Sequence, residues 1–323
     1  MKSILVIGGA GYIGSHVVLS FLNAGFDVTV LDNLSSGRQI NLFDEAKFIH
    51  ADLQDRVALN EVFKKPYDGV IHLAALKAAG ESMIVPEQYA YQNINGTMNL
   101  LEALSNSKTK VLIFSSSAAV YGLPRYLPLD EKHPLEPVNF YGFTKLEIER
   151  FLDWFFRLKG IHYASLRYFN AAGYDTEGRI KGLEQKPANL IPIVMEAAIG
   201  LREKVDVYGN DYPTSDGTGI RDYIHVTDLA DAHLKAFNLV HKKGESLAVN
   251  LGTGTGHSVL DVIKMAEKIS GKAIKHEFAE RRPGDPAELY STADKAEKLL
   301  KWKPKFSDLK TIVSSTWEVY KPA

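Results

Sequence analysis

The sequence predicts an α/β fold in which helices cover both faces of a parallel β-sheet. Apolar strands and amphipathic helices alternate along the first 170 residues, as in linked βαβ units. The first strand, Ser3–Ile7, runs into a glycine-rich turn, and the helix Tyr12–Asn23 follows it. We therefore expect a Rossmann-type, doubly wound sheet domain at residues 1–172, with a return segment at about 225–250. The irregular remainder, residues 173–323, is expected to form mainly a smaller α/β lobe.

The composition is that of an ordinary globular protein and narrows the classes of site. The 323 residues carry a formal net charge of -1, which gives no indication of nucleic acid or an anionic membrane as a partner. There is no cysteine, which excludes disulfides, thiolate metal sites and a cysteine nucleophile, and we predict no metal site. Residues 1–22 are apolar, but four glycines and His16 interrupt them, so we expect no signal peptide and a cytoplasmic protein.

The glycine-rich turn is typical of dinucleotide binding. Gly8, Gly11 and Gly14 lie between a strand and a helix, where backbone N–H groups and the helix dipole face a pyrophosphate. Asp32 ends the second strand about 20 residues further on, where a carboxylate accepts hydrogen bonds from an adenosine ribose. Its charge repels a 2′-phosphate and favours NAD over NADP. The nearby Arg38 leaves NADP open, because an arginine can pair with that phosphate.

Three further polar side chains follow or face the predicted strand ends, and each has two readings. Asp52 either accepts a hydrogen bond from the adenine amino group or caps the helix expected at residues 54–63. Lys77 either neutralises a cofactor phosphate or lies in solvent. Asn93, on a long helix expected over residues 86–104, faces either the cofactor or the surface. The small residues Ala74 and Ala75, after a fourth strand, leave room for a flat cofactor.

A serine, a tyrosine and a lysine form the candidate catalytic group. A fifth strand at residues 110–114 ends in Ser115–Ser117, and ligands of open parallel sheets bind beyond the carboxyl ends of the strands. Tyr141 and Lys145 are four residues apart and share one face of a helix. We expect the lysine, together with a cationic nicotinamide, to move the pKa of Tyr141 from about 10 toward about 7, which requires roughly 4 kcal/mol.

Nearly the whole chain resembles the extended short-chain dehydrogenase/reductases and, within them, the UDP-glucose 4-epimerases. The resemblance rests on motifs in both halves: residues 8–16, 31–34, 72–78, 114–117, 120–122, 141–145, 167–170 and 209–226. The block at residues 209–226 is the most particular to the epimerases. The resemblance implies further NAD contacts at Tyr12, Ile13, Asn33, Leu53, Leu73, Ser115 and Tyr168.

The family resemblance implies a reversible oxidation at C4 of a UDP-hexose. Tyr141 takes the proton of the sugar 4-hydroxyl while the hydride passes to NAD. Lys145 supports the phenolate and holds the nicotinamide ribose, and Ser117 hydrogen-bonds the reacting oxygen. The 4-keto sugar turns over and receives the hydride on its opposite face. The implied substrate contacts are Ser117, Tyr141, Asn170, Asn189, Leu190, Val205, Tyr208, Arg221, Arg282, Asp285 and Leu289, with Arg281 as a competitor for the role of Arg282.

The resemblance also implies a homodimer through helices at residues 86–104 and 141–157. Leu289 stands where bulky aromatic residues exclude an N-acetyl group, so we expect activity on UDP-GlcNAc and UDP-GalNAc as well. Two alternatives remain. A nucleotide-sugar dehydratase or decarboxylase is the first, although a dehydratase carries an Asp-Glu pair where this chain has Ala118 and Ala119. A non-catalytic NAD-sensing protein is the second, although such proteins typically lose the tyrosine and lysine.

Overall fold

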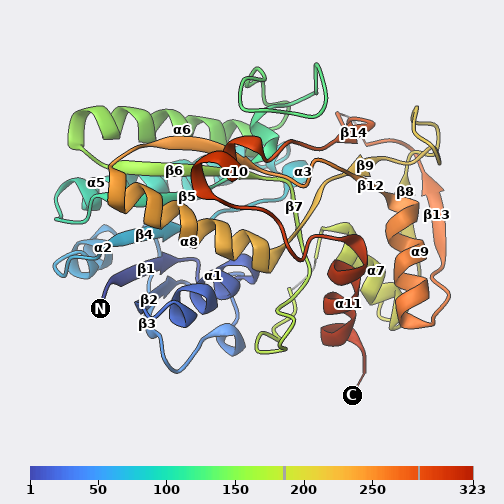
Figure 1. Cartoon of the computed structure of the whole chain (residues 1–323), viewed down its shortest axis with the longest axis horizontal. Helices are drawn as coiled ribbons and strands as arrows, with labels where there is room; N and C mark the ends of the chain where they lie inside the picture. Colours follow the sequence, from blue (N-terminus) through green and yellow to red (C-terminus); the bar gives the residue numbers. More distant parts are fainter. Residues whose placement is uncertain (185–186, 283, 323) are drawn as a thin grey trace.

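The larger of two lobes is built on one parallel sheet (Figure 1). The computed structural model describes residues 1–184, 187–282 and 284–322. Within them the sheet has seven strands in the order β11-β6-β5-β4-β1-β2-β3, which confirms the predicted doubly wound fold. The strands are β1 (Ser3–Ile7), β2 (Asp27–Asp32), β3 (Lys47–His50), β4 (Gly69–His72), β5 (Val111–Ser117), β6 (His162–Tyr168) and β11 (Leu247–Leu251).

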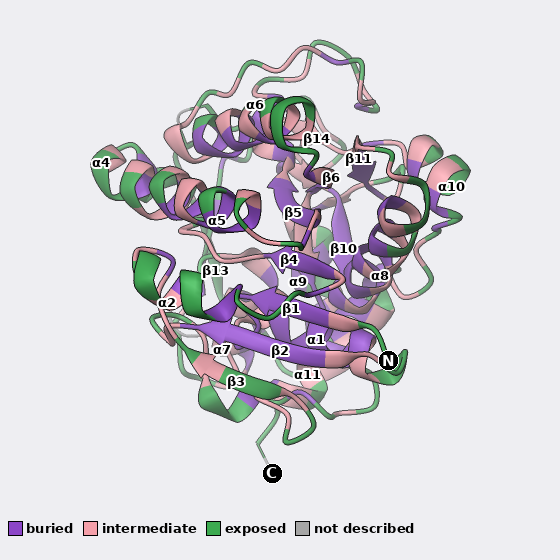
Figure 2. Cartoon of the chain, turned by 90° about the vertical axis from the view of Figure 1, so that its left-hand side faces the viewer, coloured by how far each residue is buried: buried purple, intermediate pink, exposed green. Residues whose placement is uncertain are grey.

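Helices cover both faces of this sheet, so its inner strands are buried on both sides, whereas the edge strand β3 is mostly exposed (Figure 2). Successive side chains of β1 point to opposite faces: Ile4 and Val6 join one core, and Leu5 and Ile7 join the other. The first core lies under α1 (Tyr12–Asn23) and α8 (Val226–Lys243). The second lies under α2 (Arg56–Val62), α5 (Gly96–Ser105) and α6 (Phe140–Lys159).

The strand order reverses at β1, and this switch point fixes where a ligand can bind. β1 pairs with β2 on one side and with β4 on the other, so Ile7 lies beside both Leu31 and His72. The chain leaves these strands in opposite directions, which opens a crevice beyond their carboxyl ends. The glycine turn, Asp32 and the small residues after β4 all lie at this edge.

The smaller lobe has its own hydrophobic core between three helices. These are α7 (Leu190–Ala198), α9 (Val259–Ser270) and α11 (Leu309–Tyr320). Its strands form short pairs: β7 (Asn170–Ala172) with β10 (Tyr223–His225), β8 (Val205–Tyr208) with β13 (His276–Ala279), and β9 (Ile220–Arg221) between β12 (His257–Ser258) and β14 (Glu288–Leu289). Ser258 caps α9 in a capping box with Asp261.

Several elements differ from the sequence prediction. The helix expected at residues 86–104 is divided into α4 (Pro86–Tyr89), a π-helical segment (Ala90–Asn95) and α5, after a short α3 (Ala79–Ser82). The helix expected at 54–63 begins at Arg56, and Asp55 caps it instead of Asp52. Single 3₁₀ turns lie at Gln39–Asn41 and Ala118–Val120.

The C-terminal part of the chain does not belong wholly to the smaller lobe. The helix α10 (Asp294–Leu300) packs on α8 and β11. Trp302 is fully buried in the core of the larger lobe, and its indole donates a hydrogen bond to the Asp228 carbonyl. Residues 294–302 thus pack on the larger lobe, where they cover α8 and the edge strand β11, although they lie in the part of the chain that was expected to form mainly the smaller lobe.

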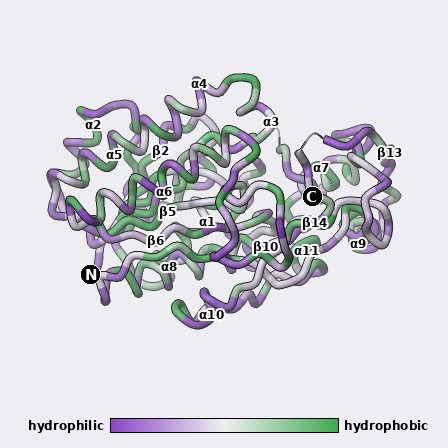
Figure 3. Tube along the Cα trace, turned by 90° about the horizontal axis from the view of Figure 1, so that it is seen from above, coloured by the Kyte–Doolittle hydropathy of each residue, from purple (hydrophilic) through white to green (hydrophobic). Residues whose placement is uncertain are grey.

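The distribution of apolar residues agrees with this two-lobed arrangement. Hydrophobic stretches fill the interior of the sheet lobe, and hydrophilic ones follow its outer edge near α2 (Figure 3). None of the helices in the described ranges combines the length and hydropathy of a membrane span.

Candidate active site

The glycine turn is packed so closely that a side chain has no room. Gly8 has φ +81°, and a Cβ there would meet the Ala74 backbone nitrogen at 2.8 Å. A Cβ on Gly14 would meet the Gly8 carbonyl oxygen at 2.0 Å. Gly11 precedes α1 without a side-chain cap, so the first N–H groups of that helix, including those of Tyr12 and Ile13, face the crevice edge. The structure thus provides an uncapped helix N-terminus behind a flat backbone surface, which fits a pyrophosphate.

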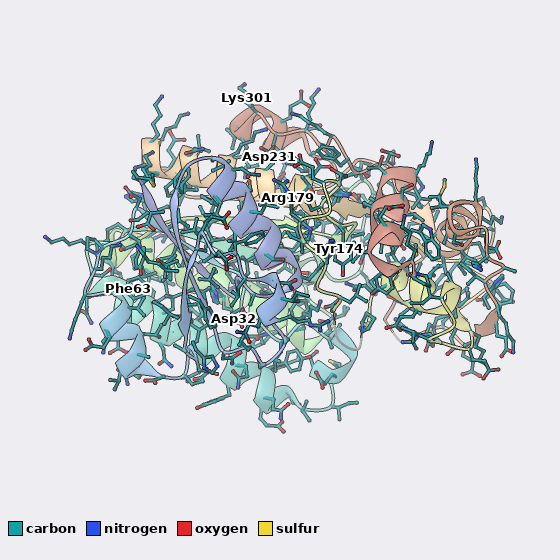
Figure 4. The ribbon with its side chains drawn as sticks, turned by 90° about the horizontal axis from the view of Figure 1, so that it is seen from below. Asp32, Phe63, Tyr174, Arg179, Asp231 and Lys301 are labelled. Atoms are coloured by element: carbon teal, nitrogen blue, oxygen red, sulfur yellow. The ribbon has the colours of Figure 1, made fainter. Side chains whose placement is uncertain are left out.

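Asp32 lies directly beside this turn. Its carboxylate accepts hydrogen bonds from the Ala10 and Leu34 N–H groups at 3.0 and 2.8 Å. A Cβ on Gly37 would touch the Asp32 carboxylate oxygens, so the following loop folds tightly over it. Figure 4 shows Asp32 on the N-terminal part of the ribbon.

Arg38, the residue that could have paired with the 2′-phosphate of NADP, makes other contacts. Arg38 donates from its guanidinium to the Leu183 carbonyl at 3.0 Å, and its own N–H donates to the Ala10 carbonyl. It therefore ties residues 180–184 to the glycine turn instead of lying free beside a ribose. This arrangement favours NAD, because a carboxylate without a free cation repels a 2′-phosphate.

The polar residues after β3 form a second group at the same edge. Asp52 accepts from the Asn33 amide at 2.6 Å and from the Gln54 N–H at 2.8 Å. It caps no helix, so the capping interpretation is wrong, and a contact with the adenine amino group stays a prediction. The neighbouring Leu53 is buried, and its carbonyl accepts from the Asn99 amide.

Asn93 and Lys77 make internal contacts near the end of β4. Asn93 is 1% exposed; its amide bonds both the N–H and the carbonyl of Leu76 and also reaches the Thr144 hydroxyl. It holds the backbone that follows Leu73, Ala74 and Ala75. The surface interpretation of Asn93 is therefore wrong. The Lys77 side chain is 53% exposed and its ammonium pairs with Glu184, so Lys77 lies in solvent in the free protein, and a contact with a cofactor phosphate stays a prediction.

Tyr141, Ser117 and Lys145 are brought together at the end of β5. Ser117 lies close enough to the Tyr141 hydroxyl to lower its pKa, and the Ser117 hydroxyl accepts a hydrogen bond from the Ala119 N–H at 3.2 Å. The Lys145 ammonium donates to the Ser115 carbonyl at 2.7 Å and lies 5.8 Å from the centre of the Tyr141 ring. The Ser115 hydroxyl in turn bonds the Tyr168 hydroxyl. The serine run and the tyrosine-lysine spacing, which are distant in sequence, form one cluster.

The pKa shifts in this cluster differ in part from the sequence expectation. Burial lowers the pKa of Lys145 to about 7, against an opposing effect of Glu149. Burial also raises the pKa of Tyr141 above its usual value, and the neighbouring Ser117 offsets only part of that rise. The expected lowering of the tyrosine pKa by the lysine is therefore absent in the free protein. A desolvated phenolate needs a second cation close by before it forms near neutral pH.

A pocket of about 220 Å³ opens beside this cluster, between the two lobes. Its described lining includes Ser117, Ala118, Ala119, Gly122, Val138, Asn139, Tyr168, Phe169, Asn170, Arg221, Gly284, Asp285, Pro286 and Leu289. Asp285 is the single carboxylate among these residues, and Ala118 and Ala119 follow the serine. The lining therefore offers no acid-base pair next to Ser117 for the elimination of water. A larger surface hollow beside α10 is lined mainly by lysines and contains none of the motif residues.

Arg221 and Asp285 face each other across this pocket. Their guanidinium and carboxylate lie 3.0 Å apart, and the arginine side chain is only 17% exposed. Each was expected to hold a different part of a nucleoside diphosphate. In the free protein they neutralise each other, so a bound diphosphate must replace or share this ion pair.

The two consecutive arginines of the second half are distinguished by their contacts. Arg282 lies flat over the Tyr208 ring, 3.8 Å from its centre. Arg281 pairs with Asp211 at 2.7 Å and stacks on Tyr212. Arg282 with Tyr208 thus forms a platform for a planar ring or an anion, whereas Arg281 is occupied outside it.

The remaining predicted substrate contacts lie in the smaller lobe and are not all accessible. Asn189 is the N-cap of α7 without a side-chain bond to the helix, and Leu190 is partly buried at its start. Val205 is fully buried in the core of the smaller lobe. Val205 and Tyr208 point to opposite sides of β8, since side chains alternate along a strand. The Val205 side chain is therefore turned away from the face that Tyr208 presents, and the contact of these residues with a substrate stays a prediction.

Asp222 is a site-building residue that the sequence reasoning missed. Its buried carboxylate accepts from the Thr253 N–H and hydroxyl and from the Ser291 N–H. Its carbonyl accepts from the Asn170 amide, and its N–H donates to the Leu289 carbonyl. Burial raises its pKa to about 7. The sequence did offer one indication of its importance, because Asp222 directly follows Arg221 within the motif at residues 209–226.

The segment after β7 joins the lobes near the cofactor edge. The Tyr12 hydroxyl donates to the Gly173 carbonyl, and His16 Nε2 accepts from the Asp175 N–H at 3.0 Å. Arg179 pairs with Asp175. Figure 4 shows Tyr174 and Arg179 in the middle of the molecule, between the first helix and the C-terminal helix.

Comparisons with known proteins agree with this geometry. The profile of the NAD dependent epimerase/dehydratase family matches residues 4–252. The chain is 46% identical to the UDP-glucose 4-epimerase of Halalkalibacterium halodurans over 320 residues, which are 99% of this chain and 96% of the relative. Among solved structures, it is similar to a UDP-glucose 4-epimerase of Brucella ovis in complex with NAD, with a TM-score of 0.96 and 40% identity, covering 99% of this chain and 98% of the other.

A third relative is named for activity on both plain and N-acetylated sugars. The UDP-Glc/GlcNAc 4-epimerase of Campylobacter jejuni is similar with a TM-score of 0.87 and 39% identity, covering 99% of each chain. Full-length similarity at this identity goes well beyond a shared fold. The chain belongs to the NAD dependent epimerase/dehydratase family, on the branch of the UDP-glucose 4-epimerases.

Proposed function

We propose that this protein is an NAD-dependent epimerase that interconverts UDP-glucose and UDP-galactose at C4 of the hexose. The observation that carries the proposal is the cluster of Tyr141, Ser117 and the buried Lys145 at the carboxyl end of β5, beside a pocket that Ser117, Arg221 and Asp285 line. Family membership over the full chain supports it. The glycine turn, Asp32 and the carboxyl ends of β1, β2 and β4 fit NAD as the resident cofactor.

The residues act together on the sugar 4-hydroxyl. NAD, when bound, supplies a reversible hydride acceptor for C4. Tyr141 accepts the hydroxyl proton, and Ser117 donates a hydrogen bond to the reacting oxygen. Lys145 stabilises the phenolate. Its low pKa keeps its own proton easily exchanged near neutral pH.

The second half holds the nucleotide more firmly than the hexose. Arg221 and Arg282 provide guanidinium groups for the diphosphate, and Asp285 provides an acceptor for the uridine ribose. The Tyr208 ring supports the uracil. Strong binding of UDP with weak binding of the hexose lets the oxidised sugar turn over without leaving the site.

We also propose activity on UDP-GlcNAc and UDP-GalNAc. Leu289 lines the pocket and packs against the cluster around Tyr121 and Leu129. A leucine leaves more space than an aromatic ring at this position. The related Campylobacter jejuni enzyme, named for both kinds of sugar, supports the same assignment.

The test is turnover with defined substrates. Purified protein with NAD is incubated with UDP-galactose, and the products are separated by chromatography. We expect UDP-glucose without net accumulation of NADH, and Tyr141→Phe is expected to lose at least 100-fold in kcat. Near-wild-type turnover of the variant would contradict the role of Tyr141. A dehydrated or decarboxylated product would assign the chain to the other branch of the family, and binding of NAD without any turnover would assign it as a sensor.

A homodimer and a cytoplasmic location remain proposals. Trp154 and Leu158 on α6 are 57% and 69% exposed, whereas Phe151 and Phe155 are partly buried against the core of their own lobe. The exposed pair supports a helix-mediated contact between two copies. Light scattering of the wild type and of Trp154→Glu tests the dimer, and cell fractionation tests the location.

A further inference from the structure

A buried ion pair lies directly beneath the proposed catalytic residues. Glu149 of α6 and Arg167 of β6 have side chains that are only 8% and 6% exposed. The Arg167 guanidinium donates to both carboxylate oxygens, from Nε at 3.0 Å and from Nη2 at 2.5 Å. Arg167 belongs to one of the motifs in the sequence, but none of the roles described above uses it. Burial of two charges is costly, so this pair requires an explanation.

The pair continues the line of catalytic side chains along α6. Tyr141, Lys145 and Glu149 follow one another at intervals of four residues and therefore share one face of the helix. Glu149 Oε1 also accepts from the Ser116 hydroxyl at 2.5 Å. Ser116 lies between Ser115, whose carbonyl binds the Lys145 ammonium, and Ser117. The carboxylate is thus connected to the lysine through the helix and to the serine run through β5.

Few other charges face this line among the described residues. Three side chains from neighbouring strands lie around Lys145. Burial and the lysine charge lower the pKa of His72 in β4 to about 3, and burial raises the pKa of Tyr168 in β6. The third is Phe114 of β5, whose ring centre lies 4.8 Å from the ammonium. All three are uncharged near neutral pH. Lys145 itself experiences the charge of Glu149, which raises its pKa against the effect of burial.

On the far side, the pair contacts two neutral side chains, with one carboxylate behind them. Arg167 Nη1 donates to the Tyr121 hydroxyl at 3.0 Å, and that hydroxyl donates to Asn250 at 2.6 Å. Glu131 stands behind, accepting from the Asn250 N–H, and acts on Tyr121. The net charge of the ion pair itself is close to zero, and Glu149 is the partner whose charge acts on Lys145.

We propose that Glu149 and Arg167 are positioning residues that balance the charge beneath Lys145, and that this balance sets the pH at which Tyr141 becomes an active base. The inference rests on the proposed roles of Tyr141 and Lys145. Without Arg167, the carboxylate raises the pKa of Lys145 and of Tyr141 behind it. Without Glu149, the guanidinium lowers both. The two partners of one ion pair thus act on catalysis with opposite sign.

The experiment compares Glu149→Gln and Arg167→Met in the full-length protein with NAD. The measured quantity is kcat for UDP-galactose from about pH 6 to about pH 10, which spans the protonation of the base. We expect the acidic limb of the profile to move by about one pH unit to lower pH in Glu149→Gln, and by about one unit to higher pH in Arg167→Met. In the double variant, which removes both charges, the limb is expected to return to its wild-type position.

Arg167→Lys is the matched control, because it keeps the positive charge and loses the two-point contact. The acidic limb of the pH profile of Arg167→Lys is expected to stay at its wild-type position, while the melting temperature of this variant falls. If Arg167→Met does not fold, Glu149→Gln and Arg167→Lys still decide the matter, because only the first is expected to move the limb. Shifts of the same sign in Glu149→Gln and Arg167→Met, or folded variants without any shift, would reduce the pair to a structural role and overturn the inference.

Tyr141→Phe separates this inference from the proposed function. If that variant keeps its turnover, the proposed function of Tyr141 fails, and the charge balance has no base to act on. If Tyr141→Phe is inactive and the limbs of the ion-pair variants do not move, the proposed function stands and only the charge balance is refuted.

Discussion

A single methyl group on Gly14 is expected to destroy the dinucleotide site. In Gly14→Ala the added Cβ would lie 2.0 Å from the Gly8 carbonyl oxygen and 2.8 Å from the Gly9 Cα atom. Ordinary contacts begin near 3.4 Å, so the turn must open by about 1.4 Å at the first of these atoms. Both obstacles are backbone atoms, which cannot rotate out of the way. The N–H groups that face the pyrophosphate therefore move with the turn.

The expected cost has two parts. Strain of this kind typically lowers stability by about 1–3 kcal/mol. A displacement of about 1 Å in a binding constellation costs about 100-fold, and we expect NAD affinity to fall by at least that factor. The assay is calorimetric titration of the cofactor-free protein with NAD, together with thermal unfolding in the presence and absence of NAD.

Gly80→Ala is the matched control for this substitution. Gly80 lies in α3, and a Cβ there meets no atom within 4 Å. It is expected to bind NAD normally and to gain up to about 1 kcal/mol of stability, since alanine restricts the unfolded chain more than glycine does. A Gly14→Ala protein that binds NAD within threefold of the wild type would refute the steric argument.

Three further predictions concern other parts of the molecule. Leu289→Tyr is expected to lower the ratio of N-acetylated to plain sugar turnover at least tenfold, roughly the discrimination that one steric clash supplies; an unchanged ratio in competition assays would remove Leu289 from the specificity site. The His233 pKa is lowered to about 4 by burial, so its contribution to stability is present above about pH 6.5 and is lost as the pH falls toward 4. Over that range the free energy of unfolding of His233→Leu is expected to fall by about 1.4 kcal/mol less per pH unit than that of the wild type, as measured in denaturant titrations. The same pH dependence in both proteins would contradict this. Trp302→Ala is expected to cost about 3–5 kcal/mol, measured by denaturant unfolding, because its ring fills the core beneath α10; a loss below 1 kcal/mol would contradict that packing.

The parts of the site that the sequence predicted well are those determined by local geometry. Gly8, Gly11 and Gly14 lie on one turn, and Tyr141 and Lys145 lie on one helix, so their spacing alone fixes their relative positions. The carboxyl ends of parallel strands share an edge, and this places Ser117 near the glycine turn once the strands are known. These relations need no knowledge of long-range packing.

The parts that the sequence did not predict depend on which side of an element the core covers. Val205 and Tyr208 are both typical of a strand, but only the packing of the smaller lobe decides that Val205 points inward. The direction of the Tyr141 pKa shift depends on burial, which spacing does not report. The ion pairs of Arg221 with Asp285 and of Arg281 with Asp211 join residues about 65 and 70 positions apart, and the sequence could not separate Arg281 from Arg282.

A comparison of Arg221 and Arg281 tests whether the residues that bind the diphosphate also take part in the oxidation step. Both side chains carry one charge and pair with one aspartate, but Arg221 lines the pocket at 17% exposure and Arg281 lies outside it at 43%. A charged hydrogen bond contributes about 1.5–3 kcal/mol, so Arg221→Met is expected to raise the KM for UDP-galactose by about 10- to 150-fold. Its kcat is expected to change less than threefold, because the diphosphate is held equally in the ground state and in the transition state.

The same substitution at Arg281 is expected to leave both constants within about twofold, since exposed ion pairs contribute little. Steady-state kinetics on the two variants decides the matter. If Arg221→Met lowered kcat at unchanged KM, Arg221 would act on the oxidation itself. If Arg281→Met raised KM as strongly, the diphosphate would lie further out, against Tyr212, and the pocket between Ser117 and Asp285 would hold only the hexose.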